Sequence, residues 1–375
     1  MDKKVRPIIK WTGGKYREFA LFAGMIPKFE RYIEPFFGGG GVFFALQPNV
    51  PSFLNDKSTD LINFYQQINQ PALHQALLKY ANAWDELSQM CLDVWENLQF
   101  VYIDFIADQV RVEELQEKMS KELKATLKEL PFIRDVDLIC DEEEFGNRLF
   151  FSAMDKARRI QVICKKEARN FNPHEIYAHF ETGLKSGFYL YFRSILNENF
   201  IGQIKLEKAQ AAANWYFVRE FCYGSMFRFN AKGEFNIPYG GITYNKKNFR
   251  QKVDYIFSPK IRQIFQASTI SNLDFEVFLK NLDLSQRDFI FLDPPYDSEF
   301  SEYDQSAFTQ ADQRRLAGVL LHIKAKWMVV IKDTAFIREI YSHPSLKISF
   351  FYKNYTYNVR GRNDRKVQHL IITNY

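Results

Sequence analysis

A tetrapeptide near the end of the chain carries the clearest chemical signal in the sequence. Asp293, Pro294, Pro295 and Tyr296 follow directly after the apolar run at residues 289–292. Such a run is typical of a buried strand, and ligands of open α/β sheets bind at the carboxyl ends of the strands. The alternative is an ordinary Pro-Pro turn with a capping aspartate, so the motif is a hypothesis that its context must support.

These residue types suit a reaction at the exocyclic amino group of a nucleobase. That nitrogen is a poor nucleophile because its lone pair is delocalised into the ring. The Asp293 carboxylate and the Pro294 carbonyl can accept its two N–H bonds and draw it toward a pyramidal geometry, since prolines fix φ and so restrict where a carbonyl points. Tyr296 offers a flat face for an extruded base, and such stacking is worth ~1–3 kcal/mol per base. Catalysis of this kind rests on positioning and electrostatic preorganisation.

Four glycines at positions 38–41 follow an expected first strand at residues 32–36. Glycines at this place let a ligand approach the backbone, and an acid about twenty residues further on can hold ribose hydroxyls. Asp56 meets that description. Phe43 stands where a dinucleotide fingerprint has its third glycine, which favours a single nucleoside over NAD. A plain glycine turn is the alternative.

The segment KWTGGK at residues 10–15 combines lysines, glycines and an indole. It lacks a preceding strand and the GxxxxGK[ST] spacing of a phosphate loop. Two interpretations stay open. The indole of Trp11 holds a cofactor at the lip of the site, or the segment is a solvated basic turn.

Apolar runs and glycine or proline punctuation predict an α/β sheet that is interrupted by a helical segment. Residues 71–183 are mainly helical and charged, and apolar residues at helical spacing predict an amphipathic helix over 112–127. The acidic stretch 141–144 is interpreted as a solvated face or a loop. Strands are predicted at 32–36, 52–56, 268–272, 288–293, 327–332, 347–352 and 366–373, with helices at 59–68, 310–323 and 335–342.

Composition excludes several classes of protein. The chain has 375 residues and a net charge of +5, which permits an anionic partner without demanding one. Its four cysteines form no CxxC pair and its six histidines show no HExxH spacing, so we expect no metal site and no disulfide framework. We find no signal-peptide pattern and no apolar run of membrane length, and therefore expect a soluble cytoplasmic protein without a membrane partner.

The motifs resemble a known family when they are taken in order. KWTGGK at 10–15, EPFFGGGG at 34–41, the pair Asn55 and Asp56, and DPPY at 293–296 follow the order of the Dam-type (D12 class) DNA adenine N6-methyltransferases. Residues 272–275, 308–313 and 360–375 resemble further segments of that family. Related acid-Pro-Pro-aromatic motifs also serve methylation of cytosine N4, RNA adenine or a protein amide, and a catalytically silent DNA-binding protein could keep the same fold.

The resemblance implies a site for S-adenosylmethionine and none for a metal. Asp293 would face both the cofactor and the target nitrogen, and Tyr296 would stack on the flipped adenine. The methyl group would pass directly to nitrogen, and DNA contacts would offset the few kcal/mol that base flipping costs. The implied cofactor-binding residues are Trp11, Lys15, Phe37, Gly38, Gly40, Asp56, Asp274, Phe275 and Asp293, and the implied catalytic residues are Asp293, Pro294 and Tyr296.

Residues 223–240 resemble the recognition hairpin of the family, with a turn at 230–233 between two short strands. Arg228 falls where the family places an arginine that reads guanine, a contact worth ~1–3 kcal/mol. Tyr223 takes the place of an aromatic wedge, and Lys10 that of a lysine at the first guanine of GATC. A folded aromatic hairpin without base contacts is the alternative. The implied DNA-binding residues are Lys10, Tyr223, Met226, Arg228 and Pro238.

The implied architecture is a doubly wound S-adenosylmethionine-dependent methyltransferase sheet, interrupted by a mainly helical target-recognition domain with a β-hairpin. Residues 1–70 and 263–375 would form the catalytic domain, 71–185 a helical insertion and 186–262 the recognition region. The segment 71–185 is longer than the short helical connection that the resemblance implies. It extends the recognised site, binds a partner such as a restriction subunit, or has no specific role. The expected partners are double-stranded DNA and a cognate restriction enzyme, with the protein a monomer or weak dimer.

Overall fold

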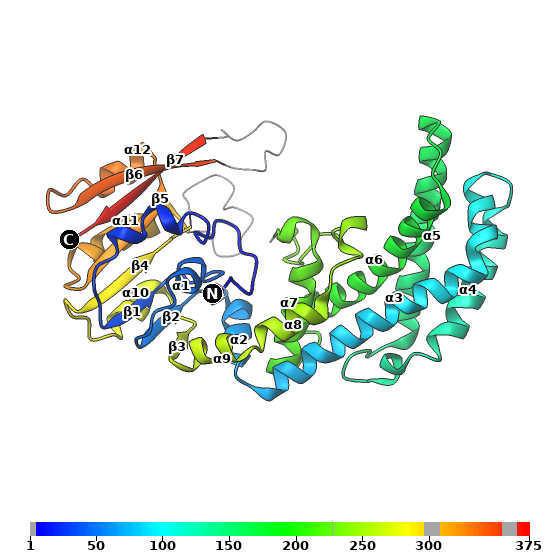
Figure 1. Ribbon diagram of the computed structural model, residues 1–375, viewed down its shortest axis with the longest axis horizontal. Helices are drawn as coiled ribbons and strands as arrows, with labels where there is room; N and C mark the ends of the chain where they lie inside the picture. The colour runs from blue at the N-terminus through cyan, green and yellow to red at the C-terminus, as the bar shows by residue number, and fades with distance from the viewer. Residues whose placement is uncertain (1–4, 227, 296–307, 355–365) are drawn as a thin grey trace. The chain divides into compact units, whose positions relative to one another are not determined.

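The computed structural model describes residues 5–226, 228–295, 308–354 and 366–375 (Figure 1). The chain divides into two compact units. The first, which we call the sheet unit, comprises Met1–Asn69 and Ile256–Tyr375. The second, the helical unit, comprises Gln70–Tyr255. The helical unit is therefore inserted within the sequence of the sheet unit.

The sheet unit is built on a seven-stranded sheet of order β3-β2-β1-β4-β5-β7-β6. The strands β1 to β5 run parallel to one another. Strand β7 lies between β5 and β6 and is antiparallel to both. Each predicted strand is confirmed, and each begins within one residue of its predicted start. The strands are β1 (Arg31–Glu34), β2 (Ser52–Asn55), β3 (Ser268–Ser271), β4 (Asp288–Leu292), β5 (Lys326–Lys332), β6 (Lys347–Asn354) and β7 (Lys366–Thr373).

The strand order reverses at the centre of the sheet. From β1 the chain builds outward through β2 and β3, then returns to place β4 on the other side of β1. Such a reversal is a topological switch point, and ligands of open α/β sheets bind in the crevice outside the carboxyl ends of the strands there. The carboxyl ends of β1 and β4 are thus where the fold favours a ligand site.

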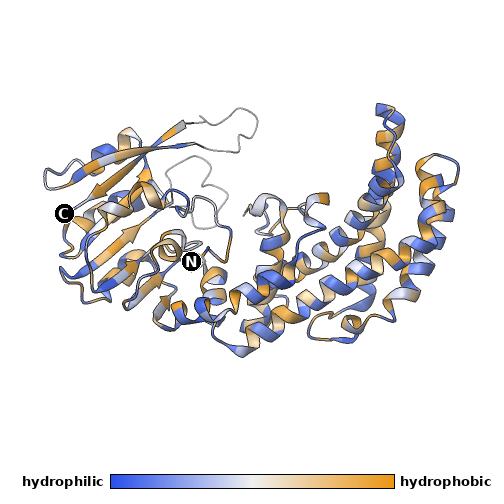
Figure 2. Cartoon of the chain, in the orientation of Figure 1, coloured by the Kyte–Doolittle hydropathy of each residue, from blue (hydrophilic) through white to orange (hydrophobic). Residues whose placement is uncertain are grey.

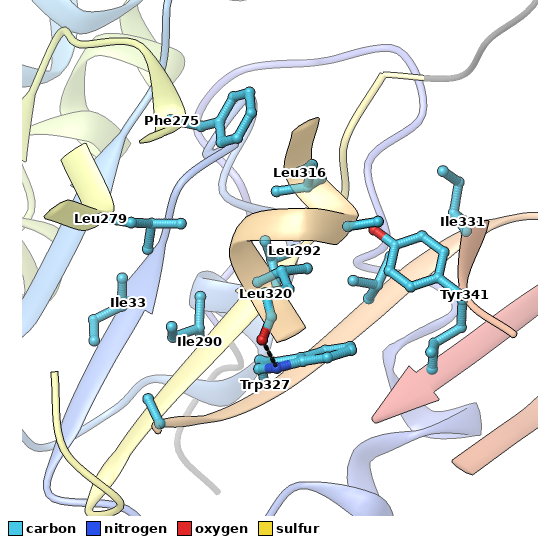
Figure 3. Packing of buried hydrophobic residues seen from close by; sticks show 14 of the residues in the cluster. Ile33, Phe275, Leu279, Ile290, Leu292, Leu316, Leu320, Trp327, Ile331 and Tyr341 are labelled. Carbon is cyan, nitrogen blue, oxygen red and sulfur yellow. Dashed lines mark hydrogen bonds between the residues drawn. The ribbon is translucent and has the colours of Figure 1, made fainter. Parts of the chain in front are cut away.

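One face of the sheet packs on three helices (Figure 3). The first follows β3, the second lies between β4 and β5 in the sequence, and the third follows β5. Ile33, Ile290 and Trp327 lie fully buried in this cluster. The Trp327 indole N–H donates to the Leu320 carbonyl at 3.0 Å, which ties β5 to the covering helix. The helices are α10 (Phe275–Lys280), α11 (Gln310–Leu321) and α12 (Ala335–Ile340).

Side chains alternate along a strand, so the residues between those of the first cluster point to the opposite face. Aromatic rings predominate there. Tyr32 and Phe289 occupy the neighbouring positions of β1 and β4, and their rings lie 6.2 Å apart. Phe43 packs 6.0 Å from the Tyr32 ring and 5.9 Å from the ring of Phe265. This layer contains α1 (Gly41–Leu46), α2 (Thr59–Gln67) and α9 (Pro259–Gln266). Helices on both faces make the sheet an α/β sandwich, as the sequence predicts.

The helical unit consists of long amphipathic helices whose apolar residues face one another (Figure 2). The predicted helix over 112–127 is confirmed. The expected boundary between 71–185 and 186–262 falls inside a single helix, α6, so the two segments share one compact unit. The helices are α3 (Pro71–Ile106), α4 (Val112–Leu127), α5 (Glu142–Glu167), α6 (Pro173–Phe200), α7 (Lys208–Phe221) and α8 (Phe249–Ile256). Short 3-10 helices cover Phe19–Leu21, Ala23–Met25, Pro131–Arg134, Tyr223–Ser225 and Ile242–Tyr244.

The acidic stretch 141–144 proves to be the start of α5. The Asp141 side chain accepts a hydrogen bond from the Glu144 backbone N–H at 2.8 Å, and so caps the helix. The acidic residues in the first turn lie at the positive end of the helix dipole, which favours negative charge.

The expected hairpin at 223–240 has its turn but little of its strand pairing. The Gly233 N–H donates to the Asn230 carbonyl at 2.9 Å, which closes the turn. In the described part of this segment, pairing is limited to the isolated bridges Phe229↔Phe235 and Cys222↔Tyr239. Two regular strands were therefore the wrong expectation. Two backbone bonds cross this segment, from the Asn230 N–H to the Glu234 carbonyl at 2.9 Å and from the Asn236 N–H to the Arg228 carbonyl at 3.3 Å. The outward-facing backbone groups of Phe235 and Ile237 bond to side chains of α6, described below.

No helix in the described ranges is long and apolar enough to cross a membrane. Among the same residues, no group of three or more His, Cys, Asp or Glu side chains could hold a metal ion.

Candidate active site

The end of β4 places Asp293 at the switch point of the sheet. Lys15 comes from the N-terminal segment, and its Nζ lies 2.5 Å from Asp293 Oδ1. The Lys15 side chain is 0% exposed and that of Asp293 is 18% exposed, so the pair is buried on the lysine side and open on the aspartate side. Lys15 Nζ also donates to the Gly13 carbonyl at 3.0 Å. The ion pair therefore holds the carboxylate in place at the edge of the sheet.

Burial sets the charge balance of this pair. Desolvation raises the pKa of Asp293, and the Lys15 ammonium opposes that rise. Desolvation likewise lowers the pKa of Lys15, against the attraction of Asp293. A second ion pair, Lys353 to Glu18 at 2.8 Å, lies near enough to act on both groups. Removal of Lys15 would take away the largest effect that opposes desolvation, which favours the neutral form of Asp293.

A second buried carboxyl stands at the end of β1. The Tyr32 hydroxyl donates to Glu34 Oε2 at 2.8 Å. Burial raises the pKa of Glu34 well above its ordinary value, and the neighbouring carboxylates of Asp293 and Asp56 raise it further. Burial and the two neighbouring carboxylates thus favour the neutral form of Glu34, against the hydrogen bond from Tyr32. Sequence reasoning assigned it no role, although it lies inside the EPFFGGGG motif that was singled out.

The glycine run makes room for the chain's own N-terminal segment. A Cβ at Gly38, where φ is +49°, would lie 2.8 Å from Trp11 Cδ1, and a Cβ at Gly39 would lie 2.7 Å from Trp11 Cβ. A Cβ at Gly41 would lie 2.9 Å from the backbone nitrogen of Lys15. These contacts are closer than any side chain tolerates. The glycines therefore let the segment that carries Trp11 and Lys15 pack against the end of β1.

The end of β2 supports the same loop. Asp56 Oδ2 accepts the Gly38 N–H at 2.8 Å and Oδ1 accepts the Ser58 N–H at 2.9 Å. These two bonds fix the Asp56 carboxylate beside the glycine loop. Asn55 bonds through its side chain to the carbonyls of Pro35 and Leu273, at 3.1 and 3.0 Å, and so joins the ends of three adjacent strands.

The end of β3 brings an acid and an aromatic ring to the edge. Asp274 caps α10 by accepting the Glu276 N–H at 2.9 Å, and Arg315 reaches both of its oxygens at 2.9 Å. The Arg315 guanidinium holds the pKa of Asp274 below its ordinary value. Arg315 also lies 4.3 Å over the Phe275 ring, which packs 5.5 Å from the ring of Phe36. Asp274 is therefore an oriented anion beside a buried aromatic cluster.

The sheet unit thus gathers the expected cofactor-binding residues along one edge. Phe37 is buried there and its ring packs 4.8 Å from that of Tyr65, while Gly40 has φ +64° at the start of α1. Pro294 is buried directly after Asp293. Tyr296 lies outside the described residues.

The expected DNA-binding side chains of the helical unit are exposed. Tyr223 is 46% exposed and Met226 41% exposed, and Arg228 and Pro238 are exposed as well. The Tyr223 N–H donates to the Pro238 carbonyl at 2.8 Å, so these two residues are adjacent. Arg228 Nε donates to Asn236 Oδ1 at 3.3 Å, which leaves its Nη groups outside this bond. Lys10, in the sheet unit, is also exposed.

Comparison with known proteins agrees with this geometry. A sequence model of the D12 class N6 adenine-specific DNA methyltransferases matches residues 11–129 and 153–359. The chain belongs to that family. The Chlorella virus NC1A type II methyltransferase M.CviBI is 31% identical over 167 residues, which cover 44% of this chain and 61% of that relative. The Lactococcus lactis type II methyltransferase M1.LlaDCHI is 22% identical over 99% of this chain and 96% of its own length. The Serratia marcescens DNA adenine methylase is 27% identical over 47% of this chain and 64% of its own length.

This D12-class chain contains a feature that sequence reasoning missed. Four residues of α6 at successive four-residue steps bond to the backbone that follows the 230–233 turn. Lys185 donates to the Asn245 carbonyl at 2.8 Å, Tyr189 and Arg193 donate to the Ile237 carbonyl at 2.7 and 3.1 Å, and Asn197 exchanges two bonds with Phe235. We call Lys185, Tyr189, Arg193 and Asn197 the α6 ladder.

The α6 ladder fixes the candidate recognition surface from beneath. Its residues lie on one face of the helix because four residues make slightly more than one helical turn. Polar residues at a spacing of four within an otherwise aromatic helix were the signal that could have revealed it. The segment that follows the 230–233 turn is thus held against α6 through its backbone, while Tyr223, Met226 and Arg228 remain exposed.

Proposed function

We propose that the protein transfers a methyl group from S-adenosylmethionine to N6 of an adenine flipped out of double-stranded DNA. One observation carries the proposal. Asp293 and Pro294 follow β4 at the topological switch point, and the buried Lys15 ammonium lies 2.5 Å from the Asp293 carboxylate. An anionic acceptor and a proline carbonyl are thereby set side by side where the fold favours a ligand.

The residues of the chain act by hydrogen bonding and orientation. The bound cofactor supplies an electrophilic methyl group on a sulfonium sulfur. Asp293 accepts one N–H of the target amino group and the Pro294 carbonyl accepts the other, so the nitrogen lone pair turns out of the ring plane toward the methyl group. Once nitrogen carries the methyl group it has a surplus proton, which Asp293 is placed to take. Tyr296 stacks on the flipped base.

The edge of the sheet fits the cofactor by its chemistry. A nucleoside needs acceptors for ribose hydroxyls and apolar surface for its base, and a sulfonium needs nearby negative charge. Asp56 is a carboxylate held at the end of β2 by the Gly38 and Ser58 N–H groups, Asp274 lies beside the buried Phe275 ring, and Asp293 supplies the charge. We propose that the cofactor is held by Trp11, Lys15, Phe37, Gly38, Gly40, Asp56, Asp274, Phe275 and Asp293.

Target recognition is assigned to the exposed surface above the α6 ladder. We propose that Arg228 reads a guanine through its Nη groups, that Tyr223 enters the duplex beside the target, and that Lys10 contacts the first guanine. Met226 and Pro238 add apolar contacts at the same surface. The proposed target is GATC or a related site, and phosphate contacts supply most of the affinity.

The proposed setting follows from the same assignment. Two of the similar proteins are named type II methyltransferases, which supports a cognate restriction enzyme as partner of this chain. We propose that the enzyme works in the cytoplasm as a monomer or weak dimer.

The test is methylation in cells that lack adenine methylation. The protein is expressed there, and the genomic DNA is sequenced by a method that detects N6-methyladenine. We expect methylated adenine confined to GATC or a closely related site. Methylation at an unrelated site would refute the assigned role of the recognition surface. A soluble, cofactor-binding protein that methylates no adenine would refute the proposed function and favour a silent DNA-binding protein.

A further inference from the structure

The segment after β4 is supported by one fully buried polar side chain. Gln313, in the first turns of α11, is 0% exposed. Its Nε2 donates to the Pro295 carbonyl at 2.8 Å. Among the described residues, its Oε1 has no hydrogen-bond partner. The Gln313 amide thus directs its N–H group to the Pro295 carbonyl and leaves its oxygen without a hydrogen bond from the described residues.

The start of α11 is well fixed, so the amide is held at a defined place. Thr309 and Asp312 form a capping box, with the Thr309 N–H donating to Asp312 Oδ2 at 2.9 Å and the Asp312 N–H to Thr309 Oγ1 at 3.3 Å. Leu316, one turn beyond Gln313, packs into the buried cluster under the sheet (Figure 3). The helix therefore anchors Gln313 from both sides.

A buried amide with one unmatched group is unfavourable for folding, because the desolvation of its oxygen is not repaid. The reverse orientation would set Gln313 Oε1 against the Pro295 carbonyl, two acceptors with no proton between them, so the donor must face Pro295. An apolar side chain of similar length would fill the same space without this penalty. The residue is thus kept for its donor rather than for packing.

Proline explains why that donor matters here. Pro294 and Pro295 have no N–H, so the carbonyl is the only backbone group through which either can be held. The Pro294 carbonyl is the proposed acceptor for the target amino group and must stay free for it. The Pro295 carbonyl is the remaining point of attachment, and Gln313 occupies it.

We infer that Gln313 is a positioning residue for methyl transfer. It holds the Pro295 carbonyl and, through the two rigid proline rings, fixes the direction of the Pro294 carbonyl and the place of Asp293. This role rests on the proposed function, because it assigns the Pro294 carbonyl to the target nitrogen. Gln313 itself does not touch the reacting atoms. Small misplacements of reacting groups lower rates strongly, by about 10²-fold for 1 Å.

The test compares Gln313→Met and Gln313→Glu with the wild type. The first keeps the length and loses the donor. The second keeps length and polarity and has no donor once its carboxyl group is ionised, so its rate is compared at the alkaline end of the pH range. Single-turnover rate, KM for DNA, cofactor Kd by calorimetry and melting temperature are measured for each. We expect the rate of both variants to fall about 10- to 100-fold, with cofactor Kd within about twofold of the wild type. Gln313→Met should melt no lower than the wild type, because its unmatched oxygen is gone.

The matched control is Gln310→Met, on the same helix one turn earlier, where the side chain is exposed. It should leave every quantity unchanged. If the wild type is active and Gln313→Met keeps its rate, the role of Gln313 is overturned and the proposed function stands. Gln313→Glu serves for the same comparison if Gln313→Met does not fold. A loss in KM or cofactor Kd with an unchanged rate overturns the role of Gln313 as well. A wild type that methylates no adenine overturns the proposed function and this role together, before any variant is compared.

Discussion

The two units of the molecule treat their polar residues in opposite ways. In the sheet unit the candidate chemical groups are buried, with Lys15 0% exposed and paired to Asp293. In the helical unit the candidate DNA-contacting groups are exposed, with Tyr223 at 46%, and the buried polar residues lie beneath them in the α6 ladder. In the sheet unit the candidate catalytic pair is thus buried except on the open side of Asp293, whereas in the helical unit the candidate contact residues are exposed above the residues that hold them.

The difference follows from what each task requires. Charge interactions are far stronger away from water, so a group that must stabilise a changing charge gains from burial. A side chain that must reach a base edge has to stand in solvent before DNA arrives. The position of such an exposed side chain is fixed only by the rigid backbone that carries it. Substitutions in each unit can test this contrast.

The largest effect is expected from Asp293→Ala. The change removes the acceptor for the target amino group and leaves the buried Lys15 ammonium unpaired. By analogy with loss of a single electrostatic contact in an active site, kcat should fall at least about 10³-fold. Methylation of a short duplex, followed with labelled cofactor, measures it. DNA affinity should change little, and retention of substantial turnover would place the chemistry elsewhere in the chain.

The next effect is a change in pH dependence for Lys15→Met. Asp293 accepts the target N–H only as an anion, so activity is lost as pH falls through its pKa, which burial already raises. Removal of the ammonium raises that pKa further, and the acid limb of the kcat profile should move to higher pH. Below the shifted pKa each pH unit costs about tenfold in activity. An acid limb that stays in place would show that Lys15 does not set the charge of Asp293.

Arg228→Ala tests the exposed surface. Loss of a bidentate contact with guanine is worth ~1–3 kcal/mol, which corresponds to about 10- to 100-fold in kcat/KM at the preferred site. Selectivity at one base pair should relax as well. Competition between duplexes that differ at single positions measures both, and Arg228→Lys serves as the control that keeps the charge. A uniform loss on all duplexes would mean that Arg228 contacts phosphate instead.

The smallest effect is expected from Tyr189→Phe in the α6 ladder. The change removes one of the two hydrogen bonds to the Ile237 carbonyl, and the bond from Arg193 at 3.1 Å is retained. The loss in unfolding free energy should be about 0.5–1.5 kcal/mol. Denaturant unfolding measures it, and methylation kinetics should show a weaker kcat/KM with unchanged cofactor Kd. A larger loss of stability than of selectivity would make the ladder a folding device only.

Much of the sheet could be predicted because its signals are local. The runs at 289–292 and 327–331 are apolar at every position and are bounded by charged residues, so the bounds of these strands follow from neighbouring residues. The recognition segment was harder. Its turn at 230–233 suggested two short paired strands, but the pairing in the described residues is limited to isolated bridges. The outward-facing backbone of Phe235 and Ile237 is held by Asn197 and Tyr189, which stand 38 and 48 positions away, so no local pattern reveals these contacts.

The sequence by itself determined the α/β class, the order of the motifs and the family, since each depends on letters that stand close together. The tertiary structure alone decided which distant residues meet. Lys15 reaches Asp293 across 278 positions, Gln313 bonds to Pro295 from the next helix, and Arg315 bonds to Asp274 across 41 positions. A single polar residue carries no periodic pattern. Its partner is set by how helices and strands pack together, and local sequence does not reveal that packing.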